Sequence, residues 1–278
     1  MKTIAICGAT GGIGQALARA YADSETRLLL AGRNQEVLTA LQKELVAKKV
    51  QVEIDIFDVR DTERVSDWCQ KAVNHGTTRL ILAAGVSASV ECVEQSNGER
   101  LYLPEAIEDL ERELNVNAVG NIIACNAFVR ALMTAYPQGT PPQHVQIGLI
   151  SSLAGLTGLP GSPGYSASKA SLRVYAEAMR RLTKGRNIGL TVLFPGFIES
   201  DMSRRYQGAK PWLMDATKGA DIIKHAIESQ KAEYAFPRIL AIGISLLNLL
   251  PRWLQPLFLK GFFFTVKPDQ ESHGIKRS

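Results

Sequence analysis

Short apolar runs alternate with longer amphipathic stretches over the first two thirds of the chain. The apolar runs have the length of strands, whereas the stretches between them repeat their apolar positions with the period of a helix. Near-continuous apolar strands joined by helical crossovers predict an α/β fold, with a doubly wound parallel sheet covered on both faces. The expected strands are residues 3–7, 27–31, 50–54, 79–83, 145–150 and 189–194, and the expected helices are 13–22, 35–47, 62–74, 106–136 and 166–184.

The regular alternation ends after residue 194. Residues 195–217 contain prolines, glycines and mixed charge, which is typical of a loop over a cleft, and a further helix is expected near 218–231. No internal repeat and no low-complexity linker divides the chain. A single domain is therefore predicted over residues 1–235, with residues 236–278 as an apolar helical extension of the same domain.

Composition narrows the class of protein. With 278 residues and 46% apolar side chains, the chain can bury a sizeable core, which excludes a disordered, collagen-like or disulfide-stapled mini-protein. The net charge of +5 arises from residues 201–278, which hold 12 Lys and Arg against 7 Asp and Glu, whereas residues 1–200 hold 20 of each. No basic patch interleaved with aromatic residues occurs, so nucleic acid is not an expected partner.

The four cysteines, Cys7, Cys69, Cys92 and Cys125, lack the C-x-x-C spacing of metal ligands. The first apolar run is too short for a signal peptide. We therefore expect reduced thiols in a cytoplasmic protein, and no metal site.

A glycine-rich segment with the spacing G-x-x-x-G-x-G directly follows the first expected strand. Bare backbone can approach a pyrophosphate closely, and the free N–H groups at the start of the next helix attract an anion. The segment lacks the Lys-Ser/Thr pair of nucleoside-triphosphate loops, so it predicts the dinucleotide site of a Rossmann-type fold. The alternative is a glycine-rich turn that binds no ligand. The cofactor contacts expected here are Gly8, Thr10, Gly11, Gly12, Ile13 and Gly14.

The second expected strand is followed by Gly32 and Arg33. In NAD-binding proteins an acid near this place accepts a hydrogen bond from the ribose 2′-hydroxyl, whereas in NADP-binding proteins an arginine accommodates the 2′-phosphate. Gly32 has no side chain that could accept this hydrogen bond, and Arg33 brings a permanent planar cation. NADP is therefore expected rather than NAD. The alternative is a solvated arginine in a loop.

An acid–base group is expected from Ser152, Tyr165 and Lys169. Tyr165 and Lys169 are four residues apart, so both side chains project from one face of a helix. An ammonium group beside a tyrosine favours the phenolate, which predicts a pKa below the usual value of about 10. Ser152 follows the fifth expected strand, at the sheet edge where ligands bind in open α/β folds.

These motifs together resemble the short-chain dehydrogenase/reductase family in its form of about this length. The glycine loop, Ser152 and the Tyr-x-x-x-Lys pair stand in the family order, and Ser152 lies thirteen residues before Tyr165. The resemblance covers roughly residues 1–235. Further matches are Asp58-Val59, Ala84-Gly85, Asn117-Ala118-Val119-Gly120 and Pro195-Gly196.

The resemblance implies a role for each matched residue. Tyr165 would be the general acid/base, and Ser152 would orient and polarise a carbonyl group. Lys169 would bind the nicotinamide ribose and lower the pKa of the tyrosine. Asn117 would hold a water molecule of a proton relay, and Asp58 would contact the adenine amino group. The other implied cofactor contacts are Val59, Ala84, Gly85, Tyr165, Lys169, Pro195, Gly196, Ile198 and Ser200.

The chain departs from the family pattern after the fourth expected strand. The family often has Asn-Asn-Ala-Gly there, whereas this chain has Leu82-Ala83-Ala84-Gly85. Because those asparagines brace the sheet and the cofactor pocket, we expect different local hydrogen bonds but retained cofactor binding. Ser200 stands where the family commonly has Thr, which keeps the hydroxyl.

The stretch from Tyr234 to Pro268 contains no acid and is rich in Leu, Ile and Phe. Its uncharged run, residues 239–251, is shorter than the ~20 residues needed to span a bilayer. Pro251 and Pro256 would break a long helix, so two short apolar helices are expected. Three alternatives follow: they complete a substrate pocket, form a contact in a homodimer or homotetramer, or make a peripheral contact through residues 238–268 with the inner face of a membrane.

These observations predict an NADP-dependent oxidoreductase that transfers a hydride between the cofactor and a carbonyl or alcohol group, with Tyr165 handling the proton. The substrate is expected to be hydrophobic because of the apolar C-terminal stretch and the Leu- and Gly-rich residues 153–161. The alternative is a non-catalytic NADP(H)-binding regulatory or scaffold protein, attached to a membrane or not. The acid/base tyrosine argues against that alternative, since a pure binder needs none.

Overall fold

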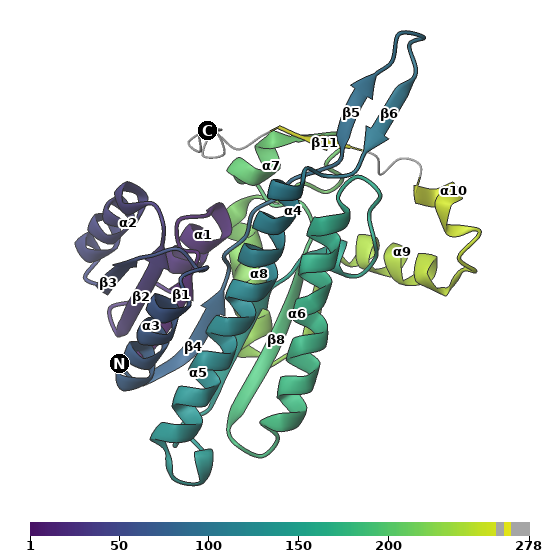
Figure 1. Cartoon of the computed structure of the whole chain (residues 1–278). Coiled ribbons are helices and arrows are strands. Elements are labelled where there is room, and N and C mark those ends of the chain that lie inside the picture. The colour runs from purple at the N-terminus through teal and green to yellow at the C-terminus, as the bar shows by residue number, and fades with distance from the viewer. Residues whose placement is uncertain (260–263, 268–278) are drawn as a thin grey trace.

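The computed structural model describes residues 1–259 and 264–267. The end of the predicted C-terminal extension, residues 268–278, lies outside the described residues. The centre of the structure is a seven-stranded parallel sheet in the order β10-β8-β7-β4-β1-β2-β3, which confirms the predicted fold class (Figure 1). The strands of this sheet are β1 (Lys2–Cys7), β2 (Thr26–Gly32), β3 (Gln51–Ile56), β4 (Thr77–Leu82), β7 (Val145–Ile150), β8 (Ile188–Pro195) and β10 (Glu233–Phe236).

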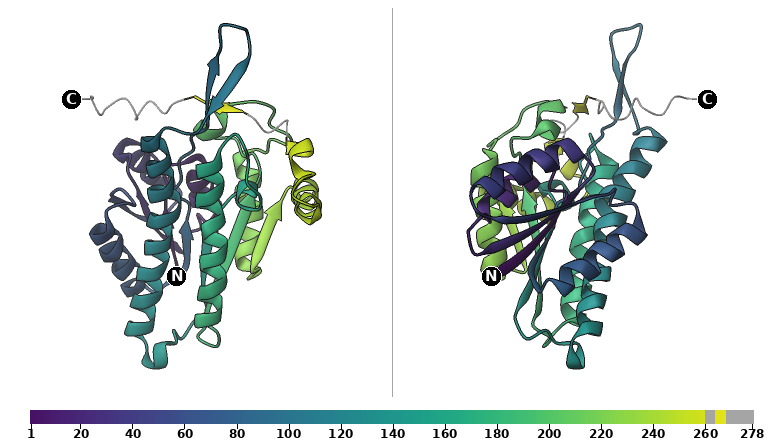
Figure 2. Two further views of the ribbon diagram at one scale, coloured as in Figure 1. Left: turned by 45° about the vertical axis from the view of Figure 1, so that its right-hand side comes forward. Right: turned by 90° about the vertical axis from the view of Figure 1, so that its left-hand side faces the viewer.

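Helices cover both faces of the sheet, so its strands are buried on each side (Figures 1 and 2). Helices α1, α2 and α8 pack on one face around residues such as Leu17 and Leu41, whereas α3, α5 and α6 pack on the other around Trp68 and Phe128. The helices are α1 (Gly12–Ala20), α2 (Gln35–Ala47), α3 (Thr62–Asn74), α4 (Ile107–Glu113), α5 (Asn121–Ala135), α6 (Pro163–Leu182), α7 (Asp201–Arg205), α8 (Ala216–Glu228), α9 (Arg238–Leu249) and α10 (Gln255–Leu259).

The long helix expected over residues 106–136 is interrupted. A π-helical segment, Leu114–Gly120, joins α4 to α5. Such segments are frequent at functional sites because the wider turn changes the direction of side chains. The stretch Ile107–Ala135 is long and apolar enough to cross a membrane by length and composition alone. However, α5 is a core helix here, because Phe128 and Leu132 are buried against the rest of the protein.

Several short elements were not expected from the sequence. Strand β10 pairs with the edge of β8, and the domain boundary predicted at residue 235 lies within it. Residues 195–217, expected as a loop, contain α7 and β9. A hairpin of β5 and β6 projects from the body of the molecule (Figures 1 and 2). The bounds of these strands are β5 (Glu91–Glu94), β6 (Arg100–Leu103), β9 (Tyr206–Gln207) and β11 (Thr265–Val266), and β11 pairs with β9.

The turn between β1 and α1 depends on glycine. Gly8 has a φ of +84°, and a Cβ atom there would lie 2.4 Å from the backbone nitrogen of Ala84. A Cβ atom at Gly14 would lie 2.1 Å from the carbonyl oxygen of Gly8. These contacts bring the start of α1 directly against the ends of β1 and β4. The helix has no side-chain cap and no acid in its first turn, so its first N–H groups remain available to an anion.

We predict that Gly14→Ala destabilises the protein, although alanine is normally the better helix former. The added methyl group would collide with the Gly8 backbone, and such overpacking typically costs about 1–3 kcal/mol. Gly11→Ala is the matched control, because its Cβ atom would find its nearest neighbour at 3.6 Å. Urea unfolding of the two variants measures the difference. An unchanged free energy of unfolding for Gly14→Ala would contradict this account of the turn.

Candidate active site

A cavity of about 480 Å³ opens at the carboxyl ends of the strands. It lies beside the point where the strand order reverses between β1 and β4, which is where open α/β sheets bind their ligands. The structure therefore brings the sequence-predicted residues together from elements that are far apart in the chain. Those that line the cavity are Gly8, Thr10, Gly11, Gly12, Ile13, Gly14, Arg33, Asp58, Val59, Ala84, Gly85, Ser152, Tyr165, Lys169, Pro195, Gly196, Ile198 and Ser200.

Ser152, Tyr165 and Lys169 meet at one end of this cavity. Tyr165 and Lys169 lie one turn apart on α6, and the Lys169 Nζ atom is 5.8 Å from the centroid of the Tyr165 ring. Lys169 is buried, and its Nζ donates a hydrogen bond of 3.0 Å to the carbonyl oxygen of Ile150 at the end of β7. Ser152 follows the same strand, and its Oγ accepts a hydrogen bond of 3.2 Å from the Ala154 N–H.

Burial is the largest influence on the pKa values of Tyr165 and Lys169. It raises the pKa of Tyr165 to about 12, although a hydrogen bond with Ser152 acts in the opposite direction. Burial also lowers the pKa of Lys169 to about 8, because the charged ammonium loses hydration. The predicted Tyr165 pKa below 10 is therefore wrong for the protein's own residues, because the loss of hydration outweighs the hydrogen bond with Ser152. The effect of Lys169 with a cofactor bound stays a prediction.

Asn117 lies behind the cavity wall, in the π-helical segment. Its side chain forms paired hydrogen bonds with Val86, accepting from the N–H at 2.8 Å and donating to the carbonyl oxygen at 2.9 Å. It also donates to the Ser168 Oγ at 3.1 Å. Asn117 thus ties the loop after β4 to helix α6. The water-holding role that the family resemblance implies stays a prediction.

The missing asparagines after β4 are compensated from another helix. Asn121 is buried at the start of α5, and its Nδ2 donates hydrogen bonds of 3.0 Å to the carbonyl oxygens of Ala84, Val116 and Asn117. The loop therefore receives its brace from α5 instead of from its own side chains. The sequence signal was an asparagine four residues after Asn117, which puts both on one helical face.

Two buried acids beside α6 were missed. Glu113 is fully buried and accepts a hydrogen bond of 2.5 Å from the Ala88 N–H, and Glu105 accepts from the Gly164 N–H at 3.0 Å. Burial raises the pKa of Glu113 to about 7, and Glu105 adds to this through its charge. Neither acid was among the predicted site residues. The spacing of Glu113 and Asn117, four residues apart, was the available signal that Glu113 faces inward.

Arg33 and Asp58 line the far end of the cavity, and Arg60 pairs with the Asp58 carboxylate. Asp58 accepts hydrogen bonds from Arg60 at 2.8 and 3.0 Å, and Arg33 lies 3.8 Å from its carboxylate. Burial alone would raise the pKa of Asp58, but these bonds outweigh it and hold the pKa below its usual value. Two cations against one anion leave this end of the cavity positive.

These residues fit a dinucleotide. The open N-terminus of α1 and the bare glycine backbone suit a pyrophosphate, and the positive end suits a phosphorylated ribose. A Cβ atom at Gly12 would lie 2.8 Å from the Ser200 Cβ, so the passage between the glycine loop and the loop after β8 requires a bare backbone. Lys169, Tyr165 and Ser152 would then hold the nicotinamide end.

An apolar wall completes the cavity on the side of the C-terminal segment. Leu240 and Ile244 of α9 line it, together with Phe264 and Val266. The same inward side of α9 packs against the core. One of the three sequence-based alternatives was that the C-terminal helices complete a pocket, and α9 does form part of the wall of this cavity. Two short helices, α9 and α10, are present as expected.

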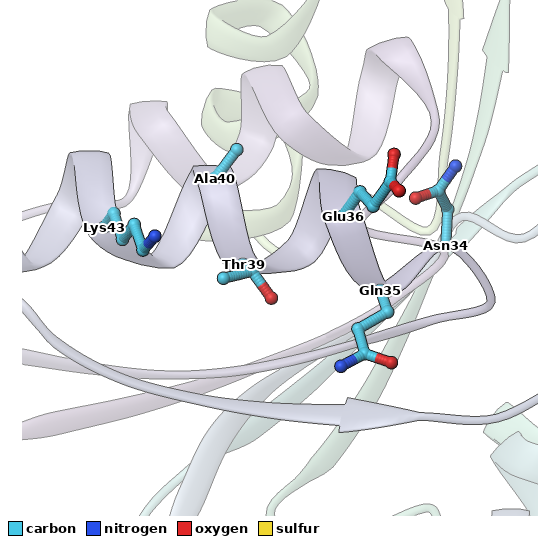
Figure 3. Close-up of a pocket in the computed structure, with 6 residues that line it drawn as sticks. All are labelled: Asn34, Gln35, Glu36, Thr39, Ala40 and Lys43. Atoms are coloured by element: carbon cyan, nitrogen blue, oxygen red, sulfur yellow. The ribbon is translucent and has the colours of Figure 1, made fainter.

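A separate hollow on the surface of α2 carries no comparable chemistry. Asn34 there serves as the helix cap, accepting a hydrogen bond of 3.0 Å from the Val37 N–H. Within residues 1–259 and 264–267, no three His, Cys, Asp or Glu side chains gather as metal ligands. Figure 3 shows the hollow, which is lined by Asn34, Gln35, Glu36, Thr39, Ala40 and Lys43.

Comparison with known proteins shows that the chain belongs to the short chain dehydrogenase family, whose sequence profile matches residues 2–210. A protein of Myxococcus xanthus called an uncharacterized oxidoreductase is 29% identical over 259 residues, covering 92% of this chain and 94% of the relative. A 3-oxoacyl-acyl-carrier-protein reductase of Bos taurus is 29% identical over 203 residues, covering 73% of this chain and 78% of the relative. The protein is thus a short-chain oxidoreductase.

Solved structures share the fold. A variant of the actinorhodin polyketide ketoreductase, solved with NADPH, matches with a TM-score of 0.69 and 20% identity. The match covers 84% of this chain and 94% of that chain. At this identity the likeness shows the Rossmann-type fold.

We predict that Glu113→Gln removes a pH dependence of stability. With a folded-state pKa near 7 against an ordinary 4.5, folded Glu113 holds a proton that the unfolded chain releases, so stability falls as pH rises between these values. The loss is at most about 3 kcal/mol. Glutamine keeps an acceptor for the Ala88 N–H but does not titrate.

Urea unfolding of both proteins at pH 5 and pH 8 tests this expectation. The difference between wild type and variant isolates Glu113 from the other titrating groups. Glu111→Gln, on the same helix and exposed, is the control. Parallel pH profiles of wild type and Glu113→Gln would show that Glu113 stays ionised in the fold.

Proposed function

We propose that the protein is an NADP(H)-dependent reductase of hydrophobic carbonyl compounds. The observation that carries this proposal is the meeting of Ser152, Tyr165 and Lys169 at one end of a cavity whose other end is the glycine loop. A protein that only binds a dinucleotide requires the loop but not the acid–base group. The function is therefore catalytic, with the substrate carbonyl beside Tyr165.

The protonation of Tyr165 fits the role of proton donor in carbonyl reduction. With a pKa near 12, the phenol keeps its proton at neutral pH and can donate it to a carbonyl oxygen that becomes an alcohol. The Ser152 hydroxyl donates a second hydrogen bond to the same oxygen. Lys169, anchored on Ile150, holds the ribose side of the cofactor. When bound, NADPH supplies the hydride.

The relatives support a carbonyl substrate. Those named 3-oxoacyl-acyl-carrier-protein reductase act, by name, on a ketone within an acyl chain, and a structural neighbour is a ketoreductase. The apolar wall of Leu240, Ile244 and Phe264 supports a hydrophobic substrate, because such a wall gives no partner to a charged one. A carbonyl carried on an apolar chain or ring fits both observations.

We also propose that the protein works in the cytoplasm, as the cysteines favour. Cys7, Cys69, Cys92 and Cys125 are free thiols, and Cys92 is exposed on the hairpin. An exposed thiol persists most readily in a reducing compartment.

The Tyr165→Phe variant is expected to lose at least about a hundredfold in kcat for NADPH-dependent carbonyl reduction, because the proton donor is removed. NADPH binding, followed by fluorescence, should change little. A panel of aldehydes, ketones and lipid-like carbonyls provides the substrates, and Tyr136→Phe is the control outside the cavity. Equal turnover by wild type and Tyr165→Phe would favour a cofactor-binding protein without catalysis.

The Arg33→Ala variant is expected to bind NADPH at least about tenfold more weakly, while its affinity for NADH stays nearly constant. The arginine would lose a charge-assisted contact with the 2′-phosphate, which NADH lacks. Dissociation constants for both cofactors measure the effect, with Arg64→Ala as the control. Tighter binding of NADH than of NADPH by the wild-type protein would remove the basis for the NADP assignment.

A further inference from the structure

Helices α9 and α10 expose an unusual number of large apolar side chains. On α9, Ile239, Ile242, Leu246 and Leu249 recur at helical spacing, so they form one stripe. Trp253 and Phe258 continue this surface through the turn and α10. Each of these six side chains is between 59% and 80% exposed. We call this surface the C-terminal apolar face.

The face is held in a defined orientation. The opposite side of α9 packs against the core through Leu240, Ala241 and Ile244. The Asn248 Nδ2 atom donates a hydrogen bond of 2.8 Å to the carbonyl oxygen of Leu156. The helix is therefore docked at the edge of the enzyme body (Figures 1 and 2). The exposed stripe lies on the side of the helix that faces away from the core. Contiguous apolar surface of this kind marks an interaction site.

Charge indicates which partner covers the face. The stretch from Tyr234 to Pro268 has no acid but contains Arg238, Arg252, Lys260 and Lys267. Arg238 and Arg252 are exposed at the two ends of the α9 stripe. In a twofold dimer the same patch meets itself, so cations would face cations without a compensating acid. An anionic lipid surface pairs with the same cations favourably.

Geometry indicates how such a surface would be bound. Helix α9 has 12 residues, or about 18 Å at 1.5 Å per residue, against about 30 Å for a hydrocarbon core. It can therefore lie in the interface but cannot span the bilayer. Exposed Trp253 beside Arg252 is the pairing that favours the headgroup region.

The β5–β6 hairpin provides a contrast. It also exposes apolar side chains, Val93 and Leu101, but carries Glu91, Glu94 and Glu99 among them. These acids would be repelled by anionic lipid. The hairpin therefore fits an anionic lipid surface less well than α9 and α10 do, and it supplies matched control positions.

We propose that the C-terminal apolar face binds anionic membranes peripherally, and that the catalytic cavity takes its substrate from the lipid phase. The second part follows from α9, whose inner residues Leu240 and Ile244 form the cavity wall while its outer stripe contacts lipid. This second part, the supply of substrate from lipid, rests on the proposed reductase function, whereas membrane attachment does not. The substrate class is then a carbonyl compound dissolved in the bilayer.

The experiment is sedimentation of the full-length protein with vesicles of phosphatidylcholine, with and without phosphatidylglycerol. Wild type should pellet with the anionic vesicles and partition at least tenfold less onto the neutral ones. The Ile242→Ser/Leu246→Ser variant should lose at least tenfold in binding, and Arg238→Gln/Arg252→Gln should lose the preference for anionic lipid. The hairpin control, Val93→Ser/Leu101→Ser, should bind as wild type does. Circular dichroism verifies that each variant is folded.

Three results would overturn the attachment: wild type remaining in the supernatant with both vesicles, equal binding by Ile242→Ser/Leu246→Ser, or an equal loss in the hairpin variant. A wild-type dimer that Ile242→Ser/Leu246→Ser dissociates, with no vesicle binding, would assign the face to a second copy instead. Sedimentation velocity provides that measurement. None of these readouts uses turnover, so they stand even if the protein proves inactive.

Activity then tests the source of the substrate. Ile242 and Leu246 do not line the cavity, so the Ile242→Ser/Leu246→Ser variant should reduce a water-soluble carbonyl at the wild-type rate. It should reduce a long-chain ketone held in anionic vesicles at least tenfold more slowly than wild type. Equal rates of the two proteins on the vesicle-held ketone would refute supply from lipid. Absence of turnover in wild type with any carbonyl would instead refute the proposed function.

Discussion

The site depends on one steric constraint: the backbone at the end of β1 touches the backbone after β4 without a side chain between them. Gly8 lies against Ala84, and Gly14 lies against Gly8. This contact sets the start of α1 at the reversal of strand order, where the first N–H groups of the helix face the cavity. The acid–base residues of α6 approach the same edge from β7, so both ends of a dinucleotide find their partners in one cavity.

The electrostatics of the site follow from low hydration more than from pairs of charges. Burial raises the pKa of Tyr165 and of Glu113 and lowers that of Lys169, so it favours the neutral form of each group. A neutral phenol is a proton donor, so Tyr165 can supply the proton of the proposed carbonyl reduction. Asn117 and Asn121 make this dry site possible, because they satisfy the backbone groups of the loop after β4 that water would otherwise have to reach.

Much of the fold and of the site could be predicted from the sequence, and the failures have physical reasons. Helices α2 and α3 match their expected bounds, because apolar periodicity and the caps Asn34 and Asp61 are local signals. Strand β10 was missed because four residues at a sheet edge carry no period. Glu113 was missed because its burial is decided by packing across α6. The direction of the Tyr165 pKa was wrong because spacing reveals a neighbouring cation but not the loss of water.

Helix α9 is apolar on both sides, which leaves its rotation about its own axis weakly determined by burial. An amphipathic helix turns its apolar side inward, but in α9 the burial of either side would be favourable. The polar contact between Asn248 and the Leu156 carbonyl breaks this degeneracy, since it can form in only one orientation. The Asn248 amide therefore helps to fix the rotation of α9 in which Leu240 and Ile244 face the cavity.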